Sequence, residues 1–212
     1  MTLIISALTF DKAFQVSDRR LTNRDGSIYS DHSNKPDKSN KSIFVQTMDT
    51  VFSIAYTGMA KLGSKSEDTD KWIVNCLTKL NPIDKTFQNI VESFHEEIIN
   101  SVQKTAGYEG PLKKLTVVLA GFTYDLSSPE QPLYEPFIIN LNSTPSHNVL
   151  LFDVGEPKDK AYRIVYNGWV QAIDGTYRKR ARKLAKSGFF HKKSDREIVN
   201  MLTTLIRAAA KD

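Results

Sequence analysis

The second residue of the chain is a threonine, and a threonine hydroxyl at the start of a chain can act as a nucleophile. The hydroxyl reacts only after a base removes its proton, and once Met1 is cleaved off the α-amine of Thr2 can be that base. An α-amine has a pKa of about 7.7–8.0, which a nearby cation lowers by disfavouring the protonated form. The chemistry therefore requires the loss of Met1 and a lysine close to Thr2. Threonine is also common at position two for other reasons, so further residues must support this interpretation.

Four such residues occur in order and at defined spacings. Asp18 lies sixteen positions after Thr2 (18 − 2 = 16), and Arg20 follows two positions later, both in the stretch Val16-Ser-Asp-Arg-Arg-Leu-Thr22. Lys41 follows Asn40 and directly precedes the predicted strand that begins Ser42-Ile-Phe-Val45. Gly58 lies in the stretch Tyr56-Thr-Gly-Met-Ala60. This series resembles the opening of proteasome β subunits and their bacterial relatives, which are N-terminal nucleophile (Ntn) hydrolases. The resemblance is strongest in the first sixty residues, and it indicates a subgroup without an assigned substrate.

The resemblance implies a role for each residue. Thr2 Oγ would attack an amide carbonyl while its own amine carries the proton, and Lys41 would tune that amine. Asp18 would hold Lys41 by a charge-assisted hydrogen bond, and Arg20 belongs to the same element. The backbone N–H of Gly58 would stabilise the oxyanion, a contribution typically worth about 2.7–4 kcal/mol. No metal or cofactor is required.

The chain departs from the family pattern at three points. Asn34-Lys35 repeats the Asn-Lys pair, so Lys35 competes with Lys41, which we favour because it adjoins the strand. Asn167-Gly168-Trp169 stands where the family has a Ser-Gly pair. The sequence ends at Asp212, where relatives continue into closing strands, so we expect either a truncated chain or a member without the last strands.

The elements that must position these residues occur in blocks. Strand patterns form two pairs, then two helical patterns follow, then more strands and two further helices. The predicted strands cover 2–9, 13–17, 42–47, 51–56, 115–122, 133–141, 147–153 and 162–166, the helices 69–80, 84–104, 177–186 and 195–209, and segment 24–40 is a predicted loop.

This order of blocks favours an α+β fold over an alternating βα fold. Helix pairs between strand blocks predict two packed sheets with helices outside, an αββα sandwich forming a single domain over 1–212. Thr69 or Asp70 is the predicted cap of the first helix. Ser194 with Glu197 three positions on is a capping box for the last helix. The expected buried face of that last helix is Ile198, Val199, Leu202, Leu205, Ile206 and Ala209.

The composition excludes several classes of protein. No run of eighteen apolar residues occurs, and the N-terminus lacks the basic segment of a signal peptide, so we expect a cytoplasmic protein. Cys76 is the single cysteine, which rules out an intrachain disulfide and is interpreted as a small buried hydrophobe. The net charge of +5 is moderately basic, and much of it lies in residues 178–186. That stripe could bind phosphates, but no stacking platform or nucleic-acid motif accompanies it, so nucleic-acid binding is the least favoured reading.

Two other motifs resemble sites but lack a required part. Residues 58–66 resemble a phosphate-binding P-loop, yet Ser64 separates Gly63 from the lysine that should follow it directly. Glu92 and His95 have the spacing of di-iron ligands, but the pattern needs a second copy, so His95 is interpreted as a boundary residue.

The sequence thus predicts a threonine-type amidohydrolase or peptidase that assembles into a homo-oligomer, possibly a ring as in proteasomes. Its partners would be a peptide or small amide substrate and other copies of the chain, with no membrane. A non-catalytic, self-assembling scaffold subunit of the same fold is the alternative.

Overall fold

The computed structural model describes residues 3–9, 11–17, 21–22, 28–29, 42–107, 114–125, 133–143, 148–151, 162–168 and 189–209. Its helices and antiparallel strands confirm the predicted α+β class. The elements are, in chain order, β1 (Leu3–Thr9), β2 (Ala13–Ser17), β3 (Leu21–Thr22), β4 (Ile28–Tyr29), β5 (Ile43–Gln46), β6 (Thr50–Gly58), β7 (Lys61–Leu62), β8 (Glu67–Asp68), α1 (Thr69–Leu80), the 3-10 turn η1 (Pro82–Asp84), α2 (Phe87–Lys104), β9 (Leu115–Asp125), β10 (Leu133–Asn142), β11 (Asn148–Leu151), β12 (Tyr162–Gly168), α4 (Phe189–Lys192) and α5 (Asp195–Ala209).

Most predicted elements are confirmed, with changes at their edges. The short strand β4 lies inside segment 24–40, which we had expected to be loop throughout; the pair Ile28-Tyr29 has the β-branched and aromatic residues that strands favour. Helix α2 begins at Phe87, because Asp84 belongs to the preceding 3-10 turn and Thr86 accepts the capping bond from Asn89 N–H. The predicted basic helix over 177–186 lies outside the described residues.

The smaller sheet has the order β12-β1-β2, so β1 is its central strand. Every residue of β1 is buried, because both faces of the strand are covered. Side chains of a strand alternate between its two faces. Leu3, Ile5 and Ala7 therefore pack with α5, whereas Ile4 and Leu8 pack against the larger sheet.

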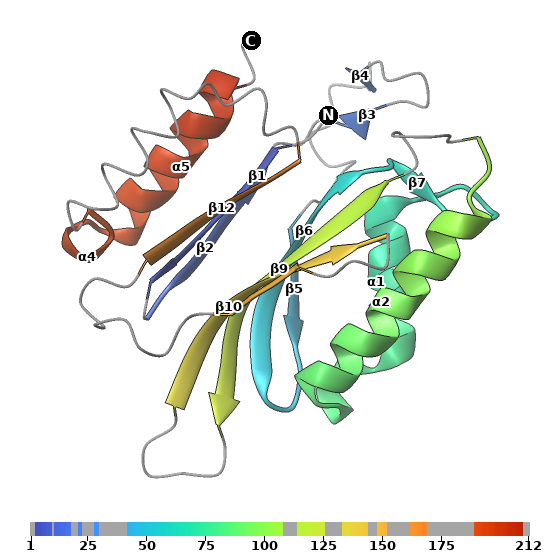
Figure 1. Ribbon diagram of the computed structural model, residues 1–212, viewed down its shortest axis with the longest axis horizontal. Coiled ribbons are helices and arrows are strands. Elements are labelled where there is room, and N and C mark those ends of the chain that lie inside the picture. The colour runs from blue at the N-terminus through green and yellow to red at the C-terminus, as the bar shows by residue number, and fades with distance from the viewer. Residues whose placement is uncertain are drawn as a thin grey trace.

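The larger sheet has the order β11-β10-β9-β6-β5 and is antiparallel throughout. One face packs on α1 and α2, where Phe52 and Ile54 of β6 meet Phe94 and Ile98 of α2. The other face contributes Ala55, among others, to the apolar cluster shared with β1. Figure 1 shows α1 and α2 beside the larger sheet and α5 beside the smaller one.

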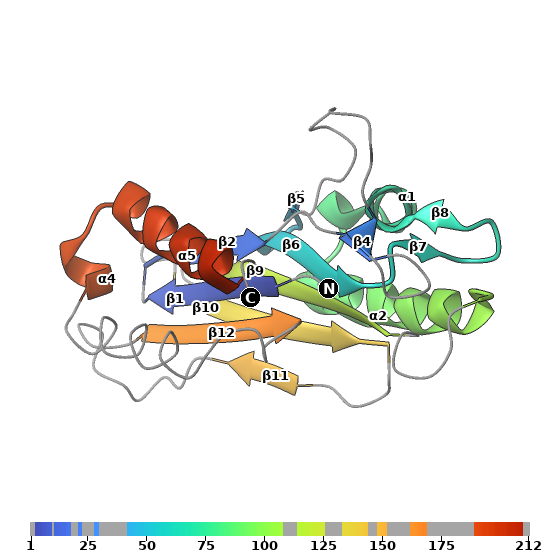
Figure 2. The ribbon, with the colours of Figure 1, turned by 90° about the horizontal axis from the view of Figure 1, so that it is seen from above.

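A half-buried amide connects the two sheets. Gln15 of β2 donates from Nε2 to the Val118 carbonyl at 3.2 Å, and its Oε1 accepts from Ser53 Oγ at 3.0 Å. Figures 1 and 2 show β1 and β6 running in opposite directions. The start of β1 and the end of β6 therefore lie at the same end of the paired sheets.

The capping box of α5 is confirmed. Ser194 N–H donates to Glu197 Oε2 at 3.0 Å, and Glu197 N–H donates back to Ser194 Oγ at 3.4 Å. Lys193 lies 2.8 Å from the same carboxylate, and its hydrogen bond and those of Ser194 lower the pKa of Glu197 to about 2. One residue of the predicted buried face is wrong: Val199 is 39% exposed, because Ile198 takes the position facing β1 and β2 and the next residue points to the flank of the helix.

The predicted cap of α1 is also wrong. Asp68 is the N-cap residue and makes no side-chain capping bond. Thr69 instead donates its hydroxyl hydrogen to the Met59 carbonyl at 2.7 Å, and its own N–H bonds the Ala60 carbonyl at 3.0 Å. The start of α1 is therefore tied to the segment that follows β6.

Candidate functional site

The predicted site residues divide between the described and undescribed parts of the chain. Thr2, Asp18, Arg20 and Lys41 lie outside the described residues, as do Lys35, Trp169, Asp212 and the basic stripe 178–186. Gly58 lies inside them. The described part of the site is therefore the end of β6 and the strands around it.

Gly58 is the last residue of β6, as the sequence predicted, and its backbone requires glycine. Its φ is +112°, a backbone angle that residues with a side chain rarely adopt. A Cβ added there would lie 2.0 Å from the Lys114 carbonyl oxygen. That same oxygen accepts a hydrogen bond from Met59 N–H at 3.1 Å, so the chain directly after Gly58 stays bonded to the residue that precedes β9.

A row of polar residues crosses the larger sheet beside Gly58. Thr57, Thr116 and Asn142 stand opposite one another in register on β6, β9 and β10. Their neighbours Tyr56, Val117 and Leu141 pack toward α1 and α2, and side chains alternate along a strand. The row therefore lies on the face turned toward β1, at the end of the sheet where β6 ends.

Hydrogen bonds hold this row in place. Thr116 Oγ donates to Asn142 Oδ1 at 2.9 Å. From the helical side, His95 Nε2 lies 2.9 Å from the Asn142 carbonyl oxygen. Next in the chain, Ser143 Oγ accepts from Leu115 N–H at 3.1 Å, and Ser143 N–H donates to the Leu115 carbonyl at 2.9 Å.

Asn140 adds a buried polar atom to the same face. It stands opposite Val118 and is 8% exposed, and its Oδ1 has no hydrogen-bond partner among the described residues. Such atoms are rare because an unpaired buried polar group costs about 1–3 kcal/mol. Thr57 is also 8% exposed, and Thr116 and Asn142 are half-buried, so Asn140 and the row form a neutral, largely buried layer of hydroxyl and amide groups on this face.

Sequence reasoning missed these residues. The available signal was the pair Asn140 and Asn142, on alternate positions of an otherwise apolar strand pattern. Thr57 and Thr116 carry no such signal in the sequence, because β-branched threonine is an ordinary strand residue. Only the register shows that they meet Asn142.

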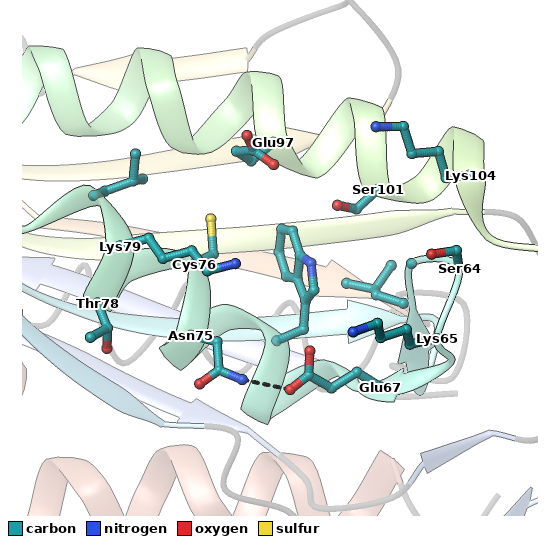
Figure 3. A pocket seen from close by; sticks show the side chains of 14 residues that line it. Ser64, Lys65, Glu67, Asn75, Cys76, Thr78, Lys79, Glu97, Ser101 and Lys104 are labelled. Atoms are coloured by element: carbon teal, nitrogen blue, oxygen red, sulfur yellow. Dashed lines mark hydrogen bonds between the residues drawn. The ribbon is translucent and has the colours of Figure 1, made fainter.

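The chain has a second candidate site, a pocket of about 910 Å³ between α1, α2 and the β7–β8 hairpin (Figure 3). Lys65, Lys79 and Lys104 line it together with Glu67 and Glu97. Cys76 also lines it, but burial raises the pKa of its thiol to about 12, with Glu97 adding to the shift. The thiol is therefore protonated near neutral pH and is a poor nucleophile, in agreement with its predicted structural role.

The structure does not support a binding site at either the P-loop-like segment or the Glu92–His95 pair. The P-loop-like residues form the β7–β8 hairpin, which turns through Gly63 and Ser66 rather than leading directly into a helix. His95 was wrongly predicted as a boundary residue, since it is 6% exposed beneath the end of β10. Among the described residues no cluster of His, Cys, Asp or Glu could hold a metal ion.

The helices described here include none long and apolar enough to cross a membrane.

The chain matches no family model and no curated protein. Among solved structures it is similar to Anbu (ancestral beta-subunit) from Yersinia bercovieri, with 10% identity and a TM-score of 0.46 over 90% of this chain and 76% of that chain. Similarity at this level does not assign the chain to a family.

Proposed function

We propose that the chain is an N-terminal-threonine amidohydrolase or peptidase of the proteasome-like Ntn class, with Thr2 as its nucleophile after removal of Met1. The observation that carries the proposal is the direction in which β1 presents its residues. Ile4 faces the larger sheet, and residues two apart in a strand share a face. If β1 continued by one residue with the same alternation, Thr2 would face the polar row and Gly58, at the end of the sheets where β6 ends.

The registers of the two hairpins support the roles of Asp18 and Lys41. Ile4 pairs with Ser17, so one further step of the β1–β2 ladder would pair Leu3 with Asp18. Ile43 pairs with Ile54, so two further steps of the β5–β6 ladder would pair Lys41 with Tyr56, two residues before Gly58. Both charged residues would then approach the start of β1. The same extension favours Lys41 over Lys35.

The proposed reaction follows from these positions. The Thr2 amine takes the hydroxyl proton as Oγ bonds to the amide carbonyl carbon, and the Gly58 N–H stabilises the oxyanion. The intermediate collapses with cleavage of the C–N bond, and the proton passes to the leaving amine. Water then attacks the threonyl ester, releasing the acid and restoring the hydroxyl. Lys41, held by Asp18, would keep the Thr2 amine neutral by its charge.

The proposal extends to architecture and assembly. We take residues 1–212 as one domain with αββα layering, which is supported by three apolar clusters in succession: α1 and α2 on the larger sheet, the larger sheet on β1, and the smaller sheet on α5. A cytoplasmic homo-oligomer belongs to the same proposal.

The decisive experiment is mass spectrometry of the protein purified from its own cells and treated with a β-lactone or epoxyketone probe. We expect the loss of Met1 and one adduct on the peptide that begins with Thr2. Thr2→Ala should abolish the adduct and leave the size of the assembly unchanged, and Thr9→Ala controls for reaction at another threonine. A retained Met1, or a processed chain without an adduct, would refute the catalytic role and favour the scaffold alternative.

A further inference from the structure

We propose that the pocket between α1, α2 and the β7–β8 hairpin binds a small planar aromatic anion. This site is separate from the proposed hydrolase site and does not depend on it. Its lining combines convergent ammonium groups with an aromatic side chain on a fixed framework.

The ammonium groups come from three different elements. Lys65 lies in the hairpin, Lys79 near the end of α1 and Lys104 at the end of α2. Figure 3 shows the side chains of Lys65 and Lys79 pointing toward each other across the pocket. Among the described residues, none of the three forms an ion pair, unlike Lys71 on the same α1, which lies 3.1 Å from Asp68. Their charge is therefore available to a ligand.

Two carboxylates balance part of this charge. Glu67 accepts a hydrogen bond from Asn75 Nδ2 at 2.6 Å, which holds it beside α1 (Figure 3). Glu97 remains on the α2 side, and the Cys76 thiol contributes no charge. Three lysines against two glutamates leave the lining at net +1, which favours an anion.

The aromatic part of the ligand would contact Trp72. This indole lines the pocket and is partly buried, and it stacks on Phe94 with ring centroids 6.1 Å apart and an interplanar angle of 23°. Phe94 thus supports the indole, and Leu62 and Leu80 add apolar lining. Planar rings stack favourably on such a surface, whereas an inorganic anion would gain nothing from it.

The hairpin wall is held in one conformation. Gly63 N–H donates to Thr105 Oγ at 2.7 Å, and that hydroxyl donates in turn to the Ser101 carbonyl at 2.6 Å. Ser66 N–H closes the turn on the Gly63 carbonyl at 3.1 Å. Lys65 is therefore carried by a turn that is anchored to α2, which reduces the entropy lost when a ligand binds.

The test compares two fluorescent probes on the full chain: 1-anilinonaphthalene-8-sulfonate and its uncharged analogue N-phenyl-1-naphthylamine. We expect the sulfonate to bind more tightly, and each of Lys65→Ala, Lys79→Ala and Lys104→Ala to weaken it by about two- to five-fold. The neutral probe should be unaffected by these changes. Lys71→Ala, an exposed lysine of α1 outside the pocket, is the matched control and should leave both affinities unchanged.

A second measurement locates the bound probe. The chain has two tryptophans, so an amide correlation spectrum contains two indole signals, and Trp72→Phe assigns them. The sulfonate should shift the Trp72 signal and not that of Trp169. Three results would each overturn the proposal: no binding of the sulfonate, an unchanged affinity for the sulfonate when Lys65, Lys79 and Lys104 are all replaced by alanine, or a shift confined to the Trp169 signal.

Discussion

Gly58 allows a prediction whose size can be worked from the structure. Gly58→Ala combines two costs: a residue with a side chain at φ +112°, and a methyl group 2.0 Å from the Lys114 carbonyl oxygen. A left-handed backbone costs about 1–2 kcal/mol for a residue with a Cβ. Forcing an extra methyl into a filled space costs about 1–3 kcal/mol. Together we expect a loss of about 2–5 kcal/mol in the free energy of unfolding.

Two other glycines separate these costs. Gly63 has φ +72° with nothing within 4 Å of its added Cβ, so Gly63→Ala should cost only the backbone term, about 1–2 kcal/mol. Gly121 has no positive φ, but its added Cβ would lie 2.2 Å from the Val51 carbonyl oxygen. Gly121→Ala should therefore cost only the overlap term, about 1–3 kcal/mol.

The assay is urea unfolding followed by circular dichroism, with the three variants measured beside the parent chain. At a slope of about 2 kcal/mol per molar urea, Gly58→Ala should lower the midpoint by about 1–2.5 M, and each of the others by less. If Gly58→Ala cost no more than Gly63→Ala, the contact with Lys114 would not constrain this position. The reasoning about the shape of the site at the end of β6 would then be wrong.

Four further outcomes test other parts of the structure. Ser194→Ala should destabilise the protein by about 1 kcal/mol in thermal unfolding, because it removes the cap of α5. In the parent chain, NMR titration should give Glu197 a pKa near 2, below its ordinary value. The carboxylate therefore stabilises the fold at a pH above the pKa of Glu197 in the unfolded chain, and this stabilisation is lost as the pH falls through the pKa in the folded chain. Ser194→Ala should raise the pKa of Glu197, and an unchanged value would contradict the hydrogen bonds between Ser194 and Glu197. Cys76, with a pKa of about 12, should react slowly with a thiol reagent at pH 8 and rapidly in urea, whereas equal rates would contradict its burial. Gln15→Leu should cost about 1–3 kcal/mol in urea unfolding, because the hydrogen bonds of Gln15 to Ser53 and to the Val118 carbonyl are lost at about 0.5–1.5 kcal/mol each, and a neutral effect would show that this bridge is dispensable.

Much of the fold could be predicted from the sequence, because each element carries its own periodic signal. The stripe of α2 and the capping box of α5 depend on neighbouring residues alone, and both were predicted correctly. Errors arose where a tertiary contact competed with a local preference. Thr69 has the residue type of a cap, but its hydroxyl is bonded to Met59, and His95 on a helix beside apolar residues is bonded to the end of β10.

The candidate site was only partly predictable. The resemblance placed Gly58 at the end of a strand, and β6 does end there, two residues beyond the strand that the residue pattern alone predicted. The polar row was missed because Thr57, Thr116 and Asn142 are far apart in sequence and meet only through the register of three strands. The pocket was missed for a similar reason, since it forms where two helices and a hairpin converge.

The central position of β1 has a consequence for the timing of folding. Leu3 pairs with Gly168, so β1 acquires its second neighbour in the smaller sheet only after residues 162–168 have been synthesised. Contacts this distant in sequence slow folding, and they cannot form during early synthesis. Until then β1 has β2 as its one neighbour in the smaller sheet, and the removal of Met1 that we propose would have that interval in which to occur. The proposed processing and the closure of the smaller sheet would then be ordered in time by the topology.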